Sequence, residues 1–444
     1  MPNFSLNVLL VLACFLITLS TNAFSTTPPH SKNRIIVKFL KDKIPNDLAN
    51  KKGLIYRKLF PHVYTVSGKT IDQMEKIFKE NKNVDYVEKD FKGNKNKFKN
   101  IIPTNQQSFL SEPNTASFFK DPMAQKQWHL NSSKKYGSSI EEAYKKRIGD
   151  KKEEVIVAIV DTGIDYKHED LINNIWINKN EIPNNQKDDD GNGYIDDYYG
   201  INTLIRDSEG KATTDPMDTH GHGTHVAGII GAVQNNGKGV AGISEKIKLM
   251  GIRTVPSRGD EKDVDVIEAF IYAAKNGAKI INCSFGKNHN EGGKSVQEAI
   301  DYIFKEYGVL VIAASGNSRR SIDRRPVYPA SFTNDSLLVV ASSQKGKGLS
   351  YFSNYGSKSV DLAAPGSNIL STYPGNRYVS LSGTSMASPV AAGVAAELLS
   401  RNNKLDGLEI KEILMQSVSP EKSYKGKLLA EGRVDLENSL KYNE

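Results

Sequence analysis

The sequence predicts a large α/β domain with a mostly parallel central sheet, preceded by a small α+β unit. From Val155 onward, apolar runs of strand length alternate with helical patterns, which is typical of a parallel sheet covered by helices on both faces. Residues 33–90 instead combine short strand patterns with one helical stretch. With 444 residues, the chain is long enough for about two to three domains.

The composition is that of a globular protein. Hydrophobic residues make up 38% and charged residues 25%, a balance that excludes a disordered or membrane-embedded chain. The formal net charge is +8, but much of the lysine excess lies in residues 32–100, away from the segments with catalytic signatures, so we expect no nucleic-acid partner. One of the two cysteines, Cys14, lies in the apolar leader, which leaves Cys283 without an intramolecular partner and predicts no disulfide framework.

The N-terminal segment predicts a signal peptide over residues 1–25. Residues 6–19 are apolar apart from Asn7 and Thr18, small residues follow, and the stretch is short for a membrane span. No Lys or Arg precedes Lys32, so the basic start of a signal peptide is missing and an uncleaved anchor is the alternative. We expect a secreted product without stable membrane association.

Residues 26–92 are expected to form the small α+β unit. Strand patterns cover 34–39, 64–66 and 84–87, and a helical pattern covers 70–80. Residues 93–120 are rich in Lys, Asn, Gln, Ser and Pro and show little periodicity, which predicts an exposed, protease-accessible linker that contains the maturation site.

Residues 121–444 are expected to form the large domain. Four apolar runs predict its central strands, at 156–160, 248–252, 278–282 and 309–313. Two helical patterns, at 264–276 and 296–307, end at Gly277 and Gly308, which are typical helix terminators.

Three distant segments carry residues that could together hydrolyse an amide. Asp161 ends the strand at 156–160, which places its carboxylate at the carboxyl edge of the sheet, where open α/β proteins build their sites. His222 lies in a glycine-rich turn before a helix of small residues, but His220 and His225 compete with it as the base, and spacing alone does not choose among them. Ser385 begins an Ala/Val/Gly-rich helix, where the helix dipole favours a developing anion; a plain N-cap serine is the alternative.

These segments, in the order Asp, His, Ser, resemble the motif set of subtilisin-like serine proteases, and the resemblance spans residues 33–440. It implies a subtilisin-like three-layer fold and a triad of Asp161, His222 and Ser385 that works through an acyl-enzyme intermediate on polypeptide substrates. It also implies that Asn317, in the stretch Ala-Ala-Ser-Gly-Asn, donates to the oxyanion. Two rival classes stay open: a catalytically silent binding protein on the same fold, and a zinc hydrolase that uses the histidine cluster.

The resemblance further implies a cleft that pairs with an extended substrate. Its walls would be Ser284, Phe285 and Gly286 on one side and Ser315 and Gly316 on the other. Val327 falls where many relatives keep a glycine at the base of the primary specificity pocket, so we expect a shallow pocket for small or medium P1 side chains. The same loop holds four arginines, which make acidic P1 residues a second hypothesis and solvated arginines the alternative: Arg319, Arg320, Arg324 and Arg325.

An Asp-rich loop predicts a structural calcium site. Its oxygens recur at alternate positions around a glycine, as in an EF-hand loop without the final Glu. The expected ligands are Asp188, Asp190, Asn192, Tyr194, Asp196 and Asp197. Asp170 and the loop at 235–236 resemble a second calcium site of the family. The stretch 237–242 fits a dinucleotide-binding pattern, but it follows a helix and precedes a strand, the reverse of the required order, so we expect no nucleotide cofactor.

The amino-terminal unit resembles the inhibitory propeptides of the same family at residues 34–39 and 83–88. That resemblance implies a ferredoxin-like propeptide that inhibits its own protease until it is cleaved. We therefore expect a self-processed zymogen whose mature form is a monomer.

Overall fold

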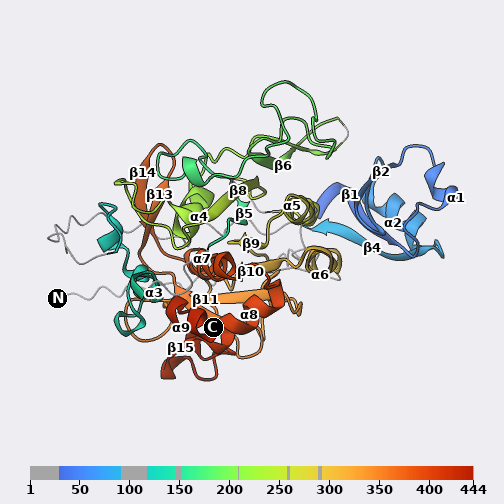
Figure 1. The fold of residues 1–444 in the computed structure, drawn as a ribbon. Helices are drawn as coiled ribbons and strands as arrows, with labels where there is room; N and C mark the ends of the chain where they lie inside the picture. Colours follow the sequence, from blue (N-terminus) through green and yellow to red (C-terminus); the bar gives the residue numbers. More distant parts are fainter. Residues whose placement is uncertain are drawn as a thin grey trace, which may run out of the picture.

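The computed structural model describes residues 30–91, 118–146, 152–208, 210–257, 261–288 and 293–443. The predicted signal peptide, with Cys14, and most of the predicted linker lie outside the described residues. Figure 1 shows an N-terminal unit (residues 30–91) set beside a larger C-terminal unit (residues 118–443), against the helices α5 (Asp263–Lys275) and α6 (Ser295–Tyr307). Within the described residues, no helix combines the length and the apolar character that a bilayer crossing requires.

The N-terminal unit is a four-stranded antiparallel sheet with strand order β2-β3-β1-β4. In chain order its elements are β1 (His30–Phe39), α1 (Asn46–Ala49), β2 (Ile55–Phe60), β3 (Val63–Ser67), α2 (Ile71–Lys79) and β4 (Val84–Phe91). This βαββαβ succession is the ferredoxin-like arrangement. The sequence did not predict β2, because Arg57 and Lys58 interrupt its apolar pattern.

One face of this sheet packs on α2 and the other faces the C-terminal unit. Val37, Phe39 and Phe78 belong to a core that lies within the N-terminal unit. Ile36 and Phe60 instead join a core of the C-terminal unit, where the Phe60 ring stacks on Tyr302 with centroids 5.5 Å apart. The two units therefore share a buried apolar interface.

The C-terminal unit is built on a ten-stranded sheet, with order β15-β16-β12-β11-β10-β9-β5-β8-β6-β7. Its strands are β5 (Val155–Asp161), β6 (Gly200–Arg206), β7 (Ala212–Thr213), β8 (Ile247–Arg253), β9 (Ile280–Cys283), β10 (Leu310–Ala314), β11 (Leu337–Ser343), β12 (Leu362–Pro365), β15 (Ser419–Pro420) and β16 (Gly432–Arg433). All neighbours from β12 to β6 run parallel. The four predicted strands are β5, β8, β9 and β10, which lie next to one another in the middle of the sheet.

Helices cover both faces of this sheet. Besides α5 and α6 they are α3 (Ile140–Lys146), α4 (His222–Gly231), α7 (Thr384–Arg401), α8 (Gly407–Gln416) and α9 (Leu436–Tyr442). Short 3₁₀ turns are η2 (Ala124–Lys126), η3 (Trp128–Leu130), η4 (Ser133–Lys135), η5 (Ile172–Asn174) and η6 (Lys422–Tyr424), and a separate hairpin is β13 (Ile369–Tyr373) with β14 (Arg377–Leu381). The predicted α5 and α6 are present within one residue of their expected starts and ends.

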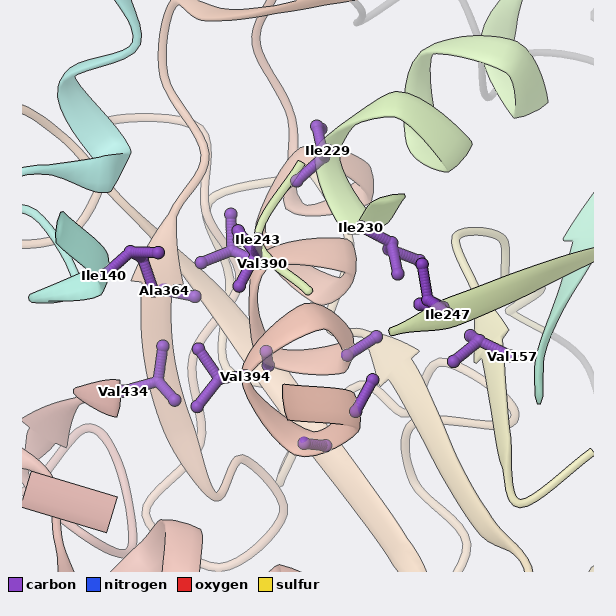
Figure 2. Packing of buried hydrophobic residues seen from close by; sticks show 14 of the residues in the cluster. Ile140, Val157, Ile229, Ile230, Ile243, Ile247, Ala364, Val390, Val394 and Val434 are labelled. Atoms are coloured by element: carbon purple, nitrogen blue, oxygen red, sulfur yellow. The ribbon is translucent and has the colours of Figure 1, made fainter. Parts of the chain in front are cut away.

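Two apolar cores on opposite sheet faces produce three layers, because successive side chains of a strand point to opposite faces. Val157 and Ile159 of β5 join the core that contains α4 and α7, whereas Ala158 and Val160 join the core with α5 and α6. Figure 2 shows the first core, where Val390 and Val394 of the buried helix α7 pack among side chains of the sheet and of α4. Because β5, β9 and β10 are parallel neighbours in the sheet, their C-terminal residues lie at the same edge of it.

Candidate active site

Asp161 and His222 meet at this edge of the sheet. Asp161 is the last residue of β5, and its Oδ1 lies 2.7 Å from Nδ1 of His222, the first residue of α4. Both side chains are buried, and Oδ1 also accepts the backbone N–H of Thr162 at 2.7 Å. A carboxylate at Nδ1 fixes the proton on that nitrogen and directs Nε2 away from Asp161.

The turn before His222 is held by Asp218, a residue that sequence reasoning missed. Its buried carboxylate accepts the backbone N–H groups of His220 and Gly221 at 2.8 and 2.9 Å, and the hydroxyl of Thr162 at 3.0 Å. Gly221 has a φ of 103°, and a Cβ there would overlap the Tyr373 ring, so only glycine fits this turn. The segment therefore sets the position of the His222 ring against β5.

The neighbouring histidines differ from His222 in what they contact. His225 is fully buried with Nε2 at 3.0 Å from the carbonyls of Ile369 and Val379, and burial lowers the pKa of His225 to about 3. Burial, followed by the nearby charge of His222, also lowers the pKa of His220. His225 is thus a neutral packing residue that ties α4 to the β13–β14 hairpin.

Ser385 lies in the first turn of α7 and faces the end of β9. Its Oγ donates to the carbonyl of Ser284 at 2.9 Å, and the Ser284 Oγ donates in return to the carbonyl of Ser385 at 3.0 Å. Asn282 supports Ser284 through its side-chain amide at 2.9 Å. Cys283, between them, is fully buried, and burial raises the pKa of its thiol well above the ordinary value, so it is not a nucleophile.

Asn317 is oriented so that its amide nitrogen faces the start of α7. Its Oδ1 accepts two hydrogen bonds from Thr384, from the backbone N–H at 2.8 Å and from the hydroxyl at 2.9 Å. A Cβ on Gly383 would lie 3.5 Å from Nδ2 of Asn317 and 3.6 Å from the backbone nitrogen of Ser385. Two N–H donors therefore border the space that the missing side chain of Gly383 leaves open. Sequence reasoning did not identify Thr384 as the residue that orients Asn317.

The predicted substrate walls follow β9 and β10, and Val327 lies between them. A Cβ on Gly286 would be 3.0 Å from Cγ1 of Val327, and a Cβ on Gly316 would be 3.9 Å from the same atom. Phe285 and Val327 are both buried in one core, and Ser315 is buried under Asn354, whose side chain donates to the Ser315 carbonyl at 2.8 Å. The Val327 side chain thus occupies the gap between the two glycines.

The four arginines of the Val327 loop differ in their exposure to solvent. Arg319, Arg324 and Arg325 are exposed, whereas Arg320 is partly buried and donates to Asn288 Oδ1 at 2.5 Å. Burial and the neighbouring charge of Arg325 lower the pKa of Arg320. Arg320 therefore lies beside Asn288, two residues after the Ser284–Gly286 wall.

The Asp-rich loop gains a carboxylate from outside itself. Glu181, seven positions before the loop, brings a ligand atom within 4.8 Å of those of Asp188 and Asp190. Glu181 is only 4% exposed, and one of its oxygens accepts the N–H groups of Asp189 and Asp190. The other oxygen has no hydrogen-bond partner among the residues that the structure describes. Three carboxylates around an orphaned buried oxygen are the donor set of a hard cation such as Ca²⁺.

The other predicted calcium ligands are divided among several contacts. Asn192 donates to both Asp190 and Asp197, and Asp197 is buried and accepts the Tyr272 hydroxyl at 2.6 Å. The Tyr194 side chain leaves the loop and donates to Glu268 of α5, and both Asp196 oxygens accept backbone N–H groups of a preceding turn. Among the described residues, the three-carboxylate group that could hold an ion thus contains Glu181 and neither Asp196 nor Asp197. Sequence reasoning missed Glu181 because it lies outside the Asp-rich loop, at no fixed spacing from it.

Asp170 lies apart from this loop, within the turn at residues 235–240. It accepts Asn236 Nδ2 at 2.7 Å and the Val240 N–H at 2.9 Å, and burial raises the pKa of Asp170 to about 6. Asp121 accepts three backbone N–H groups of the same turn, at 2.8 to 3.3 Å. The carboxylates of Asp170 and Asp121 thus both accept N–H groups of this turn.

Comparison with known proteins places these features in a family. The profile of the subtilase family matches residues 152–437. The chain is similar to "Subtilisin-like protease 1" of Plasmodium berghei (strain Anka), with 32% identity over 343 residues, covering 73% of this chain and 55% of that protein. It is similar to thermitase of Thermoactinomyces vulgaris, with 35% identity over 286 residues, covering 64% of this chain and 88% of thermitase. The chain therefore spans little more than half the length of the Plasmodium relative.

The fold is similar to that of fervidolysin from Fervidobacterium pennivorans, "a keratinolytic enzyme related to subtilisin", with a TM-score of 0.71. The likeness covers 93% of this chain and 61% of fervidolysin at 22% identity, and it confirms the predicted fold class. Because the family profile covers residues 152–437 of 444, more than half of the chain, this chain belongs to the subtilase family of subtilisin-like serine proteases.

Proposed function

We propose that this chain is a serine endopeptidase that hydrolyses polypeptides through Asp161, His222 and Ser385. The observation that carries the proposal is the buried contact of 2.7 Å between Asp161 and His222; Ser385 at the start of α7, with two N–H donors around Gly383, supports it. Ser385 Oγ attacks the scissile carbonyl while His222 Nε2 takes its proton, and Asp161 stabilises the imidazolium that forms. Asn317 Nδ2 and the Ser385 N–H bind the oxyanion, and water then releases the acyl-enzyme.

A covalent probe tests this proposal against its two rivals. A fluorophosphonate should label the mature chain on Ser385, and His222→Ala should suppress labelling because the serine then lacks its base. Zinc chelation should leave labelling unchanged. Failure of the folded chain to be labelled would favour a silent binding protein, and loss of peptide hydrolysis on zinc chelation would favour the metal-dependent hydrolase.

We propose that the N-terminal unit is the inhibitory propeptide of this protease. Two carboxylates of β4 support this role by occupying helix N-termini of the C-terminal unit. Glu88 accepts the N–H groups of Lys294 and Ser295 at 2.8 and 3.2 Å at the start of α6, and Asp90 accepts the Val264 N–H at 3.1 Å at the start of α5. β4 then ends at Phe91, from where the chain continues toward the predicted maturation site. In the Ser385→Ala variant the unit should stay attached to the purified chain, as SDS–PAGE would show.

We propose that Glu181, Asp188 and Asp190 bind a structural calcium ion, with Asn192 and the main chain around Tyr194 completing its oxygen shell. The buried Glu181 oxygen without a partner supports this assignment. We propose a second calcium ion at Asp170. Isothermal titration of the chelated chain with Ca²⁺ tests both sites, because Glu181→Gln should remove one binding event and Asp170→Asn the other.

We propose that the enzyme prefers small or medium P1 residues. The support is the Val327 Cγ1 that lies between Gly286 and Gly316. The second hypothesis, acidic P1, is supported by the partly buried Arg320 beside the same wall. A P1-scanning peptide library tests both: preference for large aromatic residues contradicts the first, and indifference to Glu contradicts the second.

We also propose that the mature enzyme is secreted and monomeric. The apolar leader of residues 6–19 supports secretion, and N-terminal sequencing of material from the culture medium would identify both cleavage points. Light scattering of the mature enzyme would test the monomer.

A further inference from the structure

Glu268 of α5 connects the N-terminal unit to the Asp-rich loop. This carboxylate is 3% exposed, forms an ion pair with Arg57 of β2 at 2.9 Å and accepts a hydrogen bond from the Tyr194 hydroxyl of the loop at 3.1 Å. It also pairs with Arg206 at the end of β6. Burial raises the pKa of Glu268, but the charges of Arg206 and Arg57 outweigh burial and lower it overall. The carboxylate is therefore ionised, and these hydrogen bonds are charge-assisted.

One helical turn further along α5, Tyr272 holds the other end of the same loop. Its hydroxyl donates to Asp197 Oδ2 at 2.6 Å, and Asp197 also accepts the side chains of Asn178 and Asn192 at 2.9 Å. The rings of Tyr194 and Tyr272 meet edge to face, with centroids 5.2 Å apart. Residues 268 and 272 thus form one seat on α5 for the loop.

The N-terminal unit and the loop face each other across this seat. Arg57 of β2 and Asp190 of the loop line the same cavity of about 420 Å³, and Glu268 and Tyr272 form part of its wall. Asp188 and Asp190 of the loop lie beside Glu181, and the ligand atoms of these three carboxylates lie within 4.8 Å of one another and repel unless a cation lies between them.

We infer that calcium binding in the Asp-rich loop strengthens docking of the N-terminal unit, because the ion fixes Tyr194 and Asp197 on the α5 seat that also holds Arg57. The inference rests on the proposed calcium site. Without the ion, carboxylate repulsion loosens the loop, and Glu268 loses the hydrogen bond from the Tyr194 hydroxyl to Oε1, the oxygen that pairs with Arg57. Coupling of two sites is reciprocal, so docking must raise calcium affinity by the same factor, and couplings of this kind are typically about 5- to 150-fold.

Hydrogen exchange in the full-length Ser385→Ala chain measures docking directly. The amides of Val264, Lys294 and Ser295 donate to Asp90 and Glu88, so their protection reports how often the N-terminal unit leaves. Removing Ca²⁺ with EGTA should lower the protection of the peptides that begin α5 and α6 by about tenfold. Glu181→Gln, which leaves the Asp170 site intact, should abolish this response.

Two further variants separate the coupling from a general effect of calcium. Tyr194→Phe keeps the ring packed on Tyr272 but removes the hydroxyl that donates to Glu268, so it should reduce the calcium response severalfold. Glu298→Gln is the matched control, because Glu298 accepts Lys38 at 2.8 Å and the Tyr86 hydroxyl at 2.9 Å, away from the loop. It should lower protection with and without Ca²⁺ and leave the ratio unchanged.

Calorimetric titration of the same proteins with Ca²⁺ distinguishes the two ways in which the inference can fail. If calcium binds the loop and protection does not change, or changes equally in Tyr194→Phe and in the parent chain, the coupling is wrong and the calcium site stands. If Glu181→Gln and the parent bind the same number of Ca²⁺ ions, the calcium site is wrong and the coupling falls with it.

Discussion

Asp161 Oδ1 lies 2.7 Å from His222 Nδ1, and both side chains are buried between the end of β5 and the start of α4. Because both side chains are buried, the Asp161 carboxylate does not exchange His222 for water as its partner. It therefore holds the imidazole in the tautomer with the proton on Nδ1. Burial also makes His222 dependent on Asp161, since loss of the carboxylate removes the acceptor of the buried Nδ1–H.

Replacing the Asp161 carboxylate with an amide should therefore inactivate the enzyme without unfolding it. Asp161→Asn preserves the side-chain size but favours the wrong tautomer of His222, for which a loss of about 10⁴ in kcat is known in a serine protease. Asp165→Asn, a nearby Asp that accepts the Gly375 N–H at 2.9 Å, is the control and should stay within a few-fold of the parent. Equal losses in both variants would point to damaged folding rather than lost catalysis.

Gly383 should be required for rate and dispensable for stability. Its φ of 170° is extended backbone that alanine adopts, and an added Cβ would meet Asn317 Nδ2 and the Ser385 nitrogen at ordinary contact distances of 3.5 and 3.6 Å. The methyl group would nevertheless occupy the space that the oxyanion needs. Gly383→Ala should lower kcat about 10²- to 10³-fold, the loss known for removal of an oxyanion donor in subtilisin, with KM nearly unchanged. Thermal denaturation should give the same Tm; a lower Tm would mean that the loss is structural.

Val327→Gly should widen the specificity of the enzyme toward large P1 residues. Removing the isopropyl group opens the gap between Gly286 and Gly316. The ratio of kcat/KM for P1 Phe over P1 Ala should rise by about 10- to 200-fold, which is the usual range for a change of this size in an apolar pocket. A library in which the P1 profile stays constant would show that Val327 does not limit the pocket.

Calcium should stabilise the chain through the Asp-rich loop. An ion at about 100 times its Kd adds about 2.7 kcal/mol to the free energy of unfolding, so EGTA should lower Tm by several degrees. Glu181→Gln should remove much of that dependence, because the variant loses the charge of the one buried ligand with an unpartnered oxygen. Asp196→Asn is the comparison, since its oxygens accept backbone N–H groups, and it should keep the calcium response.

The sequence predicted most accurately those parts that local patterns specify. The strands β5, β8, β9 and β10 are buried on both faces, so they appear as unbroken apolar runs. The strands β6 and β2 carry polar or charged residues within their length, lack such runs and were not predicted. In the candidate site, motif matching identified the segments of Asp161 and His222, which the structure brings together. The catalytic roles of these residues and of Ser385 stay predictions. The contacts of Thr384 with Asn317, and of Glu181 with Asp188, join segments at no fixed spacing, and only the folded chain shows them.

Docking of the N-terminal unit should weaken as the pH rises from about 4.5 to about 7. Burial, followed by the charge of Asp263, raises the pKa of Glu88 from 4.5 to about 7 in the docked state. Asp263 pairs with Lys287, and burial raises the pKa of Asp263 to about 6. The described residues also place the Tyr86 hydroxyl and the donors of Lys294 and Ser295 around Glu88. A pKa that is higher in the docked than in the free state means that docking takes up a proton. Docking is thus strongest at acidic pH and weakens between pH 4.5 and about 7, by up to about two orders of magnitude.

In the Ser385→Ala chain, protection factors at the start of α6, which already correct for the intrinsic pH dependence of exchange, should fall across this window. Glu88→Gln carries no titrating group at this position and should flatten the profile; a profile that rises with pH in the parent chain would contradict the assignment.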